Sequence, residues 1–136
     1  MNSEYDVIKA AIAIAQADIG AGGLVPLTGN ATPLIRFHDI GHFTLPISTI
    51  AILGSTVARG TPLSLNVEVQ FDAFVKHGSE GLDVQMIDRL IEVMTTPNFK
   101  AQSLDAGVTL GGRRMLSDLE DGRLRMSQDM TIRLAR

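Results

Sequence analysis

The sequence contains no cysteine and no tryptophan, and it has one tyrosine and five phenylalanines among its 136 residues. Without cysteine, neither a disulfide framework nor a thiolate metal site can form, so an oxidising compartment is not required. The scarcity of aromatic rings argues against a surface that stacks nucleic-acid bases. No apolar run reaches the roughly 20 residues that a membrane-spanning helix needs. The N-terminus is acidic, unlike a secretory signal, so we expect an intracellular protein that makes no membrane contact.

The remaining composition is that of one folded domain. Apolar residues make up 45% of the chain and charged residues 20%, which is typical of globular proteins. Neither an internal repeat nor a long linker divides the sequence, so we expect a single domain over residues 1–136. The net charge is −3, but the last 24 residues hold six arginines against four acidic residues. The C-terminal end is therefore locally basic.

Two segments have the apolar periodicity of helices. The first covers residues 4–19, begins after Ser3 and ends before Gly20. The second follows Ser79, a residue that can cap a helix. Its apolar stripe, which we interpret as core, consists of Leu82, Met86, Ile87, Leu90, Ile91 and Met94. Residues 20–33 are rich in glycine, proline and threonine, so we expect a long loop there.

Alternation of apolar and polar residues predicts the strands. It is clearest over residues 63–75, where one face is apolar and the other polar. Shorter apolar runs at 34–37 and 45–53 predict two further strands. A terminal hairpin is expected after residue 107, with Asp121-Gly122 supplying the turn. The fold class is therefore α+β: a mainly antiparallel sheet with two helices packed on one face and a C-terminal β-hairpin.

The string His38-Asp39-Ile40-Gly41-His42 resembles the metal-binding signature of HD-domain phosphohydrolases. Those enzymes place the pair on a helix and need a further histidine well upstream, whereas no histidine precedes His38 here. The flanking prolines, Pro33 and Pro46, favour extended chain and a turn instead. We therefore predict no catalytic residue, no metal site and no cofactor, and expect that the protein is not an enzyme.

Two other features point to structure and assembly. Gly111-Gly112 precedes Arg113-Arg114 without the lysine and helix of a phosphate-binding loop, so we interpret the glycines as a strand bend or bulge. The region 20–60 has more apolar residues than a small sheet can bury, which indicates subunit contacts. These residues are Leu24, Val25, Leu27, Phe43 and Ile47.

The layout resembles the tail-terminator (tail-completion) proteins of long-tailed bacteriophages, over roughly residues 4–135. The likeness rests on the N-terminal helix and its glycine-rich loop, the strand at 65–74, the helix at 83–94 and the hairpin segment 114–125. It implies a virion subunit that assembles in the host cytoplasm as a ring, expected to be hexameric. Such a ring caps the last ring of tail tube protein and meets the head-tail connector protein. Genome DNA would pass through the lumen without specific binding.

Within this resemblance, the basic hairpin supplies the candidate interface. Arginines on a return strand can face acidic patches on a neighbour and set specificity. The candidates are Arg113, Arg114, Arg123 and Arg125. Reversing Arg123 and Arg125 to glutamate is expected to weaken assembly without unfolding the monomer. The long loop at 20–33 and the stretch 38–44 depart from the commoner family pattern.

Three alternatives remain at this point. Another neck or head-closure connector subunit needs an adhesive α+β domain of the same size. A metal-dependent phosphohydrolase depends wholly on His38-Asp39 and His42. A general interaction domain requires no site at all.

Overall fold

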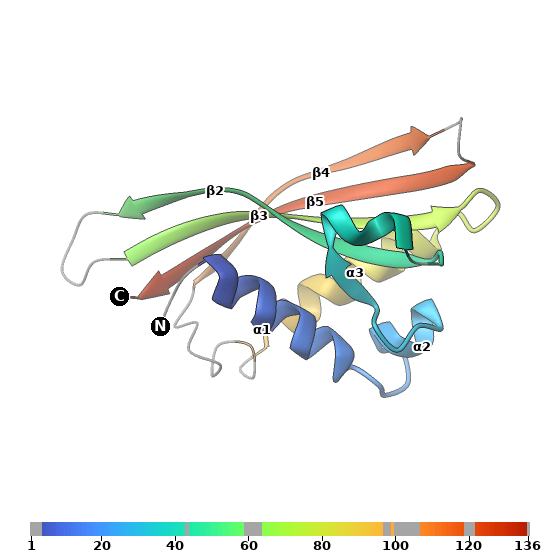
Figure 1. The fold of residues 1–136 in the computed structure, drawn as a ribbon, viewed down its shortest axis with the longest axis horizontal. Helices are drawn as coiled ribbons and strands as arrows, with labels where there is room; N and C mark the ends of the chain where they lie inside the picture. The colour runs from blue at the N-terminus through green and yellow to red at the C-terminus, as the bar shows by residue number, and fades with distance from the viewer. Residues whose placement is uncertain are drawn as a thin grey trace.

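The computed structural model describes residues 4–42, 44–58, 64–96, 99, 107–118 and 122–135. Helices pack on a single mixed sheet (Figure 1). The strands are β1 (Leu34–Arg36), β2 (Ile47–Ala58), β3 (Ser64–Lys76), β4 (Val108–Asp118) and β5 (Arg123–Ala135). The helices are α1 (Glu4–Gln16), α2 (Leu24–Thr28), the 3-10 helix η1 (Phe37–His42) and α3 (Leu82–Met94).

The sheet has five strands in the order β1-β2-β3-β5-β4. The short β1 is parallel to β2, and every other neighbouring pair is antiparallel. The prediction of an α+β fold with a mainly antiparallel sheet and a C-terminal hairpin is therefore confirmed, with β4 and β5 forming that hairpin. Gly122 adopts a φ of 64° at its turn, a conformation that glycine reaches without steric cost.

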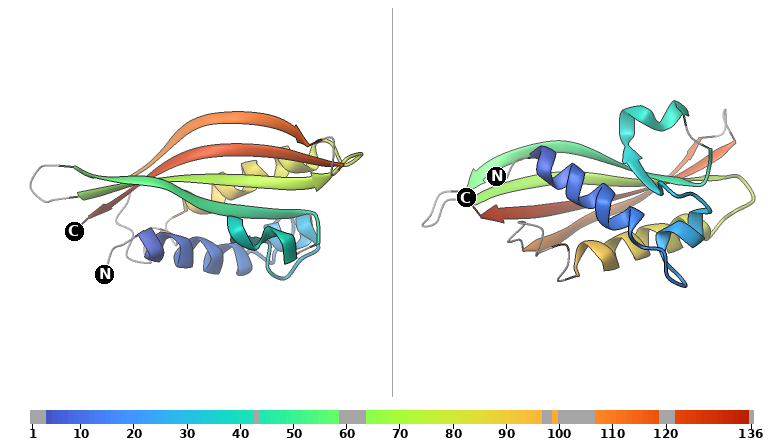
Figure 2. Two further views of the ribbon diagram at one scale, coloured as in Figure 1. Left: turned by 45° about the horizontal axis from the view of Figure 1, so that its top comes forward. Right: turned by 60° about the horizontal axis from the view of Figure 1, so that its bottom comes forward.

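The two faces of the sheet differ because the side chains of β3 and β5 alternate between them, and residues that share a face lie opposite each other in the register. The apolar row of β3 lies opposite the even-numbered residues of β5, from the pair Leu65 and Leu134 to the pair Val75 and Leu124. This side is covered by α1 and α3, whose buried residues join one continuous core with it (Figure 2). We call it the helical face, and the other side the opposite face. Each large apolar side chain buried here contributes about 1.5–3 kcal/mol.

The core includes the apolar stripe of α3. Met86, Leu90 and Met94 are almost fully buried, so the interpretation of this stripe as core is confirmed. The helix begins at Leu82 and its N-cap is Gly81, with φ at 96°, rather than the predicted Ser79. The carboxylate of Asp83 accepts the backbone N–H of Gly81 at 3.2 Å.

Two strands, β2 and β4, contain an irregularity of pairing, and both irregularities adjoin the same cross-strand row of the sheet. The register shifts between Ile52 and Gly54 in β2 and between Leu110 and Arg113 in β4. Both shifts border the row that contains the paired Val69 and Met130. The predicted strand bend or bulge at Gly111-Gly112 is therefore confirmed, as a bulge. A bulge bends a strand and raises its local twist, and the strands cross in projection where the sheet twists (Figure 1).

Residues 20–33 are not wholly a loop, as the sequence suggested. Asp18 accepts the backbone N–H of Leu24 at 2.8 Å, which fixes the start of α2. Gly29 ends this helix with a φ of 65°. Leu24 and Ile47 are fully buried, so the expectation that they contact another subunit is wrong. Val25 and Leu27 are partly exposed, and Phe43 lies outside the described residues.

Candidate subunit interface

Arg113 and Arg114 lie on opposite faces of the sheet because they are neighbours in one strand. On the helical face, Arg113 donates to Asp88 of α3 at 2.8 Å and to the side-chain oxygen of Gln128 at 2.9 Å. Arg114 lies on the opposite face and pairs with Asp129 at 3.1 and 3.2 Å. The exposed fractions of the two arginine side chains are 33% and 49%. Both guanidinium groups therefore remain partly accessible at the outer strand.

Arg125 has a different environment, since its partner is a buried carboxylate. The Asp72 side chain is fully buried, and Arg125 donates to it at 3.1 Å. Gln70 and Ser127 donate to the same carboxylate. A buried charge is costly unless it is paired and hydrogen-bonded, so Arg125 and its neighbours are needed for Asp72 to be tolerated in the fold.

Aromatic rings complete this cluster on the opposite face. The Phe37 ring of η1 lies 6.4 Å from the ring of Phe74. The guanidinium of Arg125 lies over both rings, at 5.3 and 5.4 Å from their centroids, and that of Arg123 lies 5.5 Å from the Phe74 centroid. Such stacking contributes about 0.5–2 kcal/mol per contact. Arg123 and Arg125 are thus engaged within the subunit, which changes their interpretation as interface residues.

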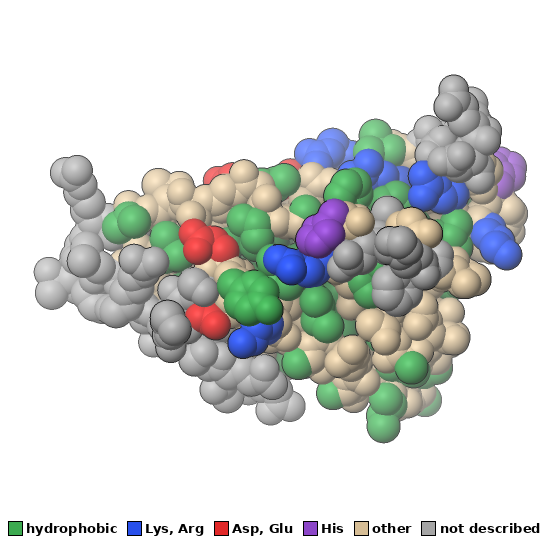
Figure 3. Space-filling view, in the orientation of Figure 1, with side chains coloured by type: hydrophobic (Ala, Val, Ile, Leu, Met, Phe, Trp, Pro, Cys, Tyr) green, Lys and Arg blue, Asp and Glu red, His purple; other side chains and the backbone are tan. Residues whose placement is uncertain are grey.

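The structure also reveals apolar residues at the two edges of the sheet. On β4, Leu110, Met115 and Leu116 are 50%, 73% and 44% exposed. On β2, Leu53 and Val57 are 52% and 53% exposed. Figure 3 shows apolar and basic side chains side by side along the edge over β4. Adjacent exposed apolar residues on an edge strand favour contact with another chain.

Sequence reasoning did not identify these edge residues. Their signal was nevertheless present, because Met115-Leu116 places apolar side chains on both faces of one strand. A strand with apolar residues on both faces is either central or covered from outside. Here β4 is the last strand in the sheet order, so no described strand covers it.

The His38 segment forms the 3-10 helix η1, not the extended chain and turn expected from the sequence. The prolines at 33 and 46 leave room for one short helix between β1 and β2. His38 is exposed, and the side chains of Asp39 and His42 lie outside the described ones. Among the described residues, no group of three or more His, Asp or Glu side chains has the geometry of a metal site.

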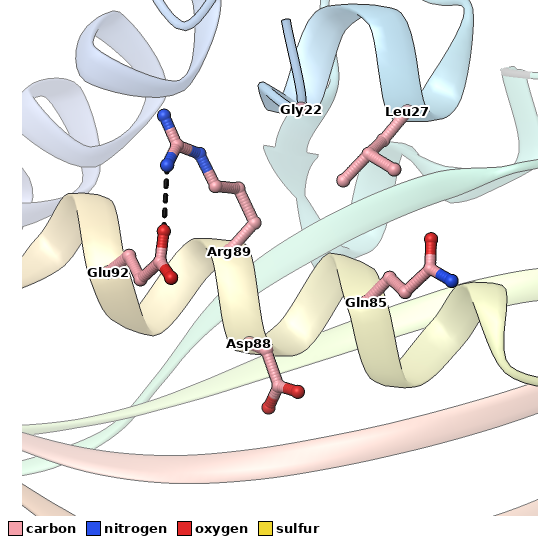
Figure 4. A pocket seen from close by; sticks show the side chains of 6 residues that line it. All are labelled: Gly22, Leu27, Gln85, Asp88, Arg89 and Glu92. Atoms are coloured by element: carbon pink, nitrogen blue, oxygen red, sulfur yellow. Dashed lines mark hydrogen bonds and ion pairs between the residues drawn. The ribbon is translucent and has the colours of Figure 1, made fainter.

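A hollow of about 310 Å³ lies between α2 and α3, lined by Leu27, Gln85, Asp88, Arg89 and Glu92 together with Gly22 (Figure 4). Arg89 donates to Asp18 at 2.6 and 2.8 Å, and also donates to Glu92 at 2.7 Å. The hydrogen bond from Arg89 lowers the pKa of Asp18, and the two carboxylates raise the pKa of Arg89. Through Asp18, Arg89 thus fastens the end of α1 and the start of α2 to α3.

Comparison with known proteins gives no family assignment: no protein-family model matches the chain, and no curated protein is significantly similar to it. Within the described residues, the helices are too short or too polar to cross a bilayer. The fold, the arginine clusters and the two sheet edges are therefore the features that bear on function.

Proposed function

We propose that this chain is a structural, non-enzymatic virion protein that assembles with copies of itself into a ring, caps the finished tail tube of a long-tailed phage and joins it to the head connector. The observation that carries the proposal is the pair of exposed apolar edges. Leu110, Met115 and Leu116 lie on the last strand at one side of the sheet, and Leu53 and Val57 lie on β2 near the other side.

Two different exposed apolar patches on one subunit, one on β4 and one on β2, favour head-to-tail assembly. A two-fold dimer uses the same patch twice, whereas a contact between unlike patches repeats until a rotation closes it into a ring. Closure leaves no free edge that would recruit further copies. A ring that closes in this way has a fixed number of subunits, as a cap on a tail tube requires.

The architecture agrees with what the tail-terminator resemblance implies. One helix-covered sheet ending in a basic hairpin is expected for such a subunit, and this chain has that arrangement. The polar cluster around Asp72 joins β3 to β5 on the opposite face through hydrogen bonds. A subunit with adhesive edges is suited to assembly rather than to chemistry.

The test is the oligomeric state of the purified chain, measured by light scattering across concentration and by negative-stain imaging, followed by its addition to uncapped tail tubes. We expect rings that bind one end of each tube and stop its elongation. Met115→Lys should abolish the rings. Ile19→Lys is the matched control, because both wild-type side chains are 73% exposed and Ile19 lies outside both edges. A strictly monomeric chain that neither binds nor caps tubes would overturn the proposal.

A further inference from the structure

We infer that β4 of one subunit pairs antiparallel with β2 of the next, so that the sheet continues from subunit to subunit around the ring. The inference rests on the proposed self-assembly and specifies the contact that produces it. The partner strand at each free edge comes from a second copy of this chain. It follows from the free edges, the strand directions and the distribution of charge.

Both strands have a free edge of useful length. β1 pairs with β2 only from Ser48 to Ile50, so residues 51–58 of β2 have no described strand on their outer side. β4 pairs with β5 on one side and with no described strand on the other. The unpaired N–H and C=O groups of such edges are a ready template for another strand.

The topology determines the relative direction of the two strands. β4 runs parallel to β3 and therefore antiparallel to β2, because each of the three intervening pairs is antiparallel. If the ring axis lies parallel to the strands, rotation from one subunit to the next keeps the direction of every strand. The neighbour's β2 would thus meet β4 antiparallel, the arrangement with the more favourable hydrogen bonds.

One offset between the two strands satisfies both the apolar and the charged residues. Leu110 and Val57 both belong to the helical face, where each is half exposed. If these two residues lie opposite each other, the registers of β4 with β5 and of β2 with β3 bring Arg114 opposite Gly54 of the neighbour. Strands in closed sheets are staggered in this way because they tilt relative to the axis.

The same offset brings together opposite charges. Glu68 is the cross-strand partner of Gly54, is exposed on the opposite face and forms no ion pair with a described residue. Gly54 has no side chain, and a Cβ at this position would meet no atom within 4 Å. An arginine at the adjoining edge could therefore reach across Gly54 to Glu68. Arg114 lies on the matching face and keeps half of its side chain exposed.

Disulfide trapping tests the pairing directly, since the natural chain has no cysteine. Opposed residues in antiparallel strands have Cα atoms about 4.5–5.5 Å apart, within the range that a disulfide spans. We expect Val57→Cys combined with Leu110→Cys to give a ladder of covalent oligomers after mild oxidation of the rings. Val57→Cys combined with Leu116→Cys is the matched control, because Leu116 lies on the other face of the same strand.

Charge exchange provides the second readout. Arg114→Glu and Glu68→Arg should each weaken self-association about fivefold, and the double variant should recover most of the loss. Lys76→Glu and Glu80→Arg, exposed residues away from both edges, should leave it unchanged. Circular dichroism separates misfolding from lost assembly.

The outcomes distinguish this inference from the proposed function. Rings that form without a crosslink between positions 57 and 110, or with equal crosslinking at 116, overturn the strand pairing and leave the ring intact. A lack of rescue by the charge exchange also overturns the Arg114–Glu68 contact. A chain that forms no ring and caps no tube overturns the pairing together with the proposed function.

Discussion

The two faces of β3 solve the problem of burial in different ways. Phe71 and Asp72 are neighbours in the sequence, both almost fully buried, and point to opposite faces. Phe71 lies in the dry core under the helices, where burial alone stabilises the fold. Asp72 is tolerated only with Arg125, Gln70 and Ser127 around it. The stability of the helical face therefore depends on how well apolar side chains fill the core, and that of the opposite face on specific hydrogen-bonding and ionic partners.

The largest effect is expected on the helical face. Phe71→Ala should remove about 3–5 kcal/mol from the free energy of unfolding, because it deletes a ring from a closely packed core and leaves a cavity. Denaturant titration measures the loss. A second substitution on the opposite face should add to it nearly independently, and strong coupling between the two faces would contradict the comparison.

A smaller effect is expected at Arg125, and it should be reversible. Arg125→Ala leaves the Asp72 carboxylate without its cation and should cost about 2–3 kcal/mol, less than a fully buried pair because the arginine is 28% exposed. Adding Asp72→Asn removes the unpaired charge and should restore part of the loss. An additive double variant would show that the charge itself is not the cause.

This expectation also revises the use of Arg125 as an interface probe. Arg125→Glu would set two carboxylates against each other at a buried site, so reduced assembly would not be separable from unfolding. Arg114→Glu is the better probe, since its partner Asp129 is partly exposed.

The smallest effect is expected where the helical layer is fastened by charge. Asp18→Asn should cost about 1–2 kcal/mol at neutral pH, because it weakens the charge-assisted hydrogen bonds from Arg89. The pKa of Asp18 is lowered in the folded state. Its contribution is therefore present above the unfolded pKa of about 3.9 and is lost as the pH falls through the folded value. Thermal melts from pH 7 to pH 2.5 should show the two proteins converging, and a constant difference would contradict this assignment.

Regular periodicity made most of the fold predictable. The alternation in β3 and β5 and the apolar stripe of α3 are long enough to specify both an element and its buried side. The five residues of α2 contain a proline and no full apolar period, so nothing distinguished them from a loop. The six residues of η1 are likewise too few to show a helical period, so this helix was not predicted either.

The candidate site was predictable in composition but not in its pairings. Alternation assigns Arg113 and Arg114 to different faces, but it does not say which acid lies across the neighbouring strand. Arg125 meets Asp72 because residues 53 positions apart are brought together by the β3–β5 register. The ion pairs and the free edges therefore emerge only once the strand order is known.

The bulges in β2 and β4 also constrain how such a sequence can change in length. Each adds one residue to a strand whose side chains point alternately to the two faces. Deleting Leu53, the extra residue of the β2 bulge, would leave Thr56 and Val57 on their present faces, whereas deleting the paired residue Ser55 would turn Thr56 towards the helices and Val57 away from them. Insertions and deletions in related sequences are therefore expected in the turns between strands or at the two bulges, and a change of length elsewhere in β2 or β4 should come with an exchange of apolar and polar residues beyond it.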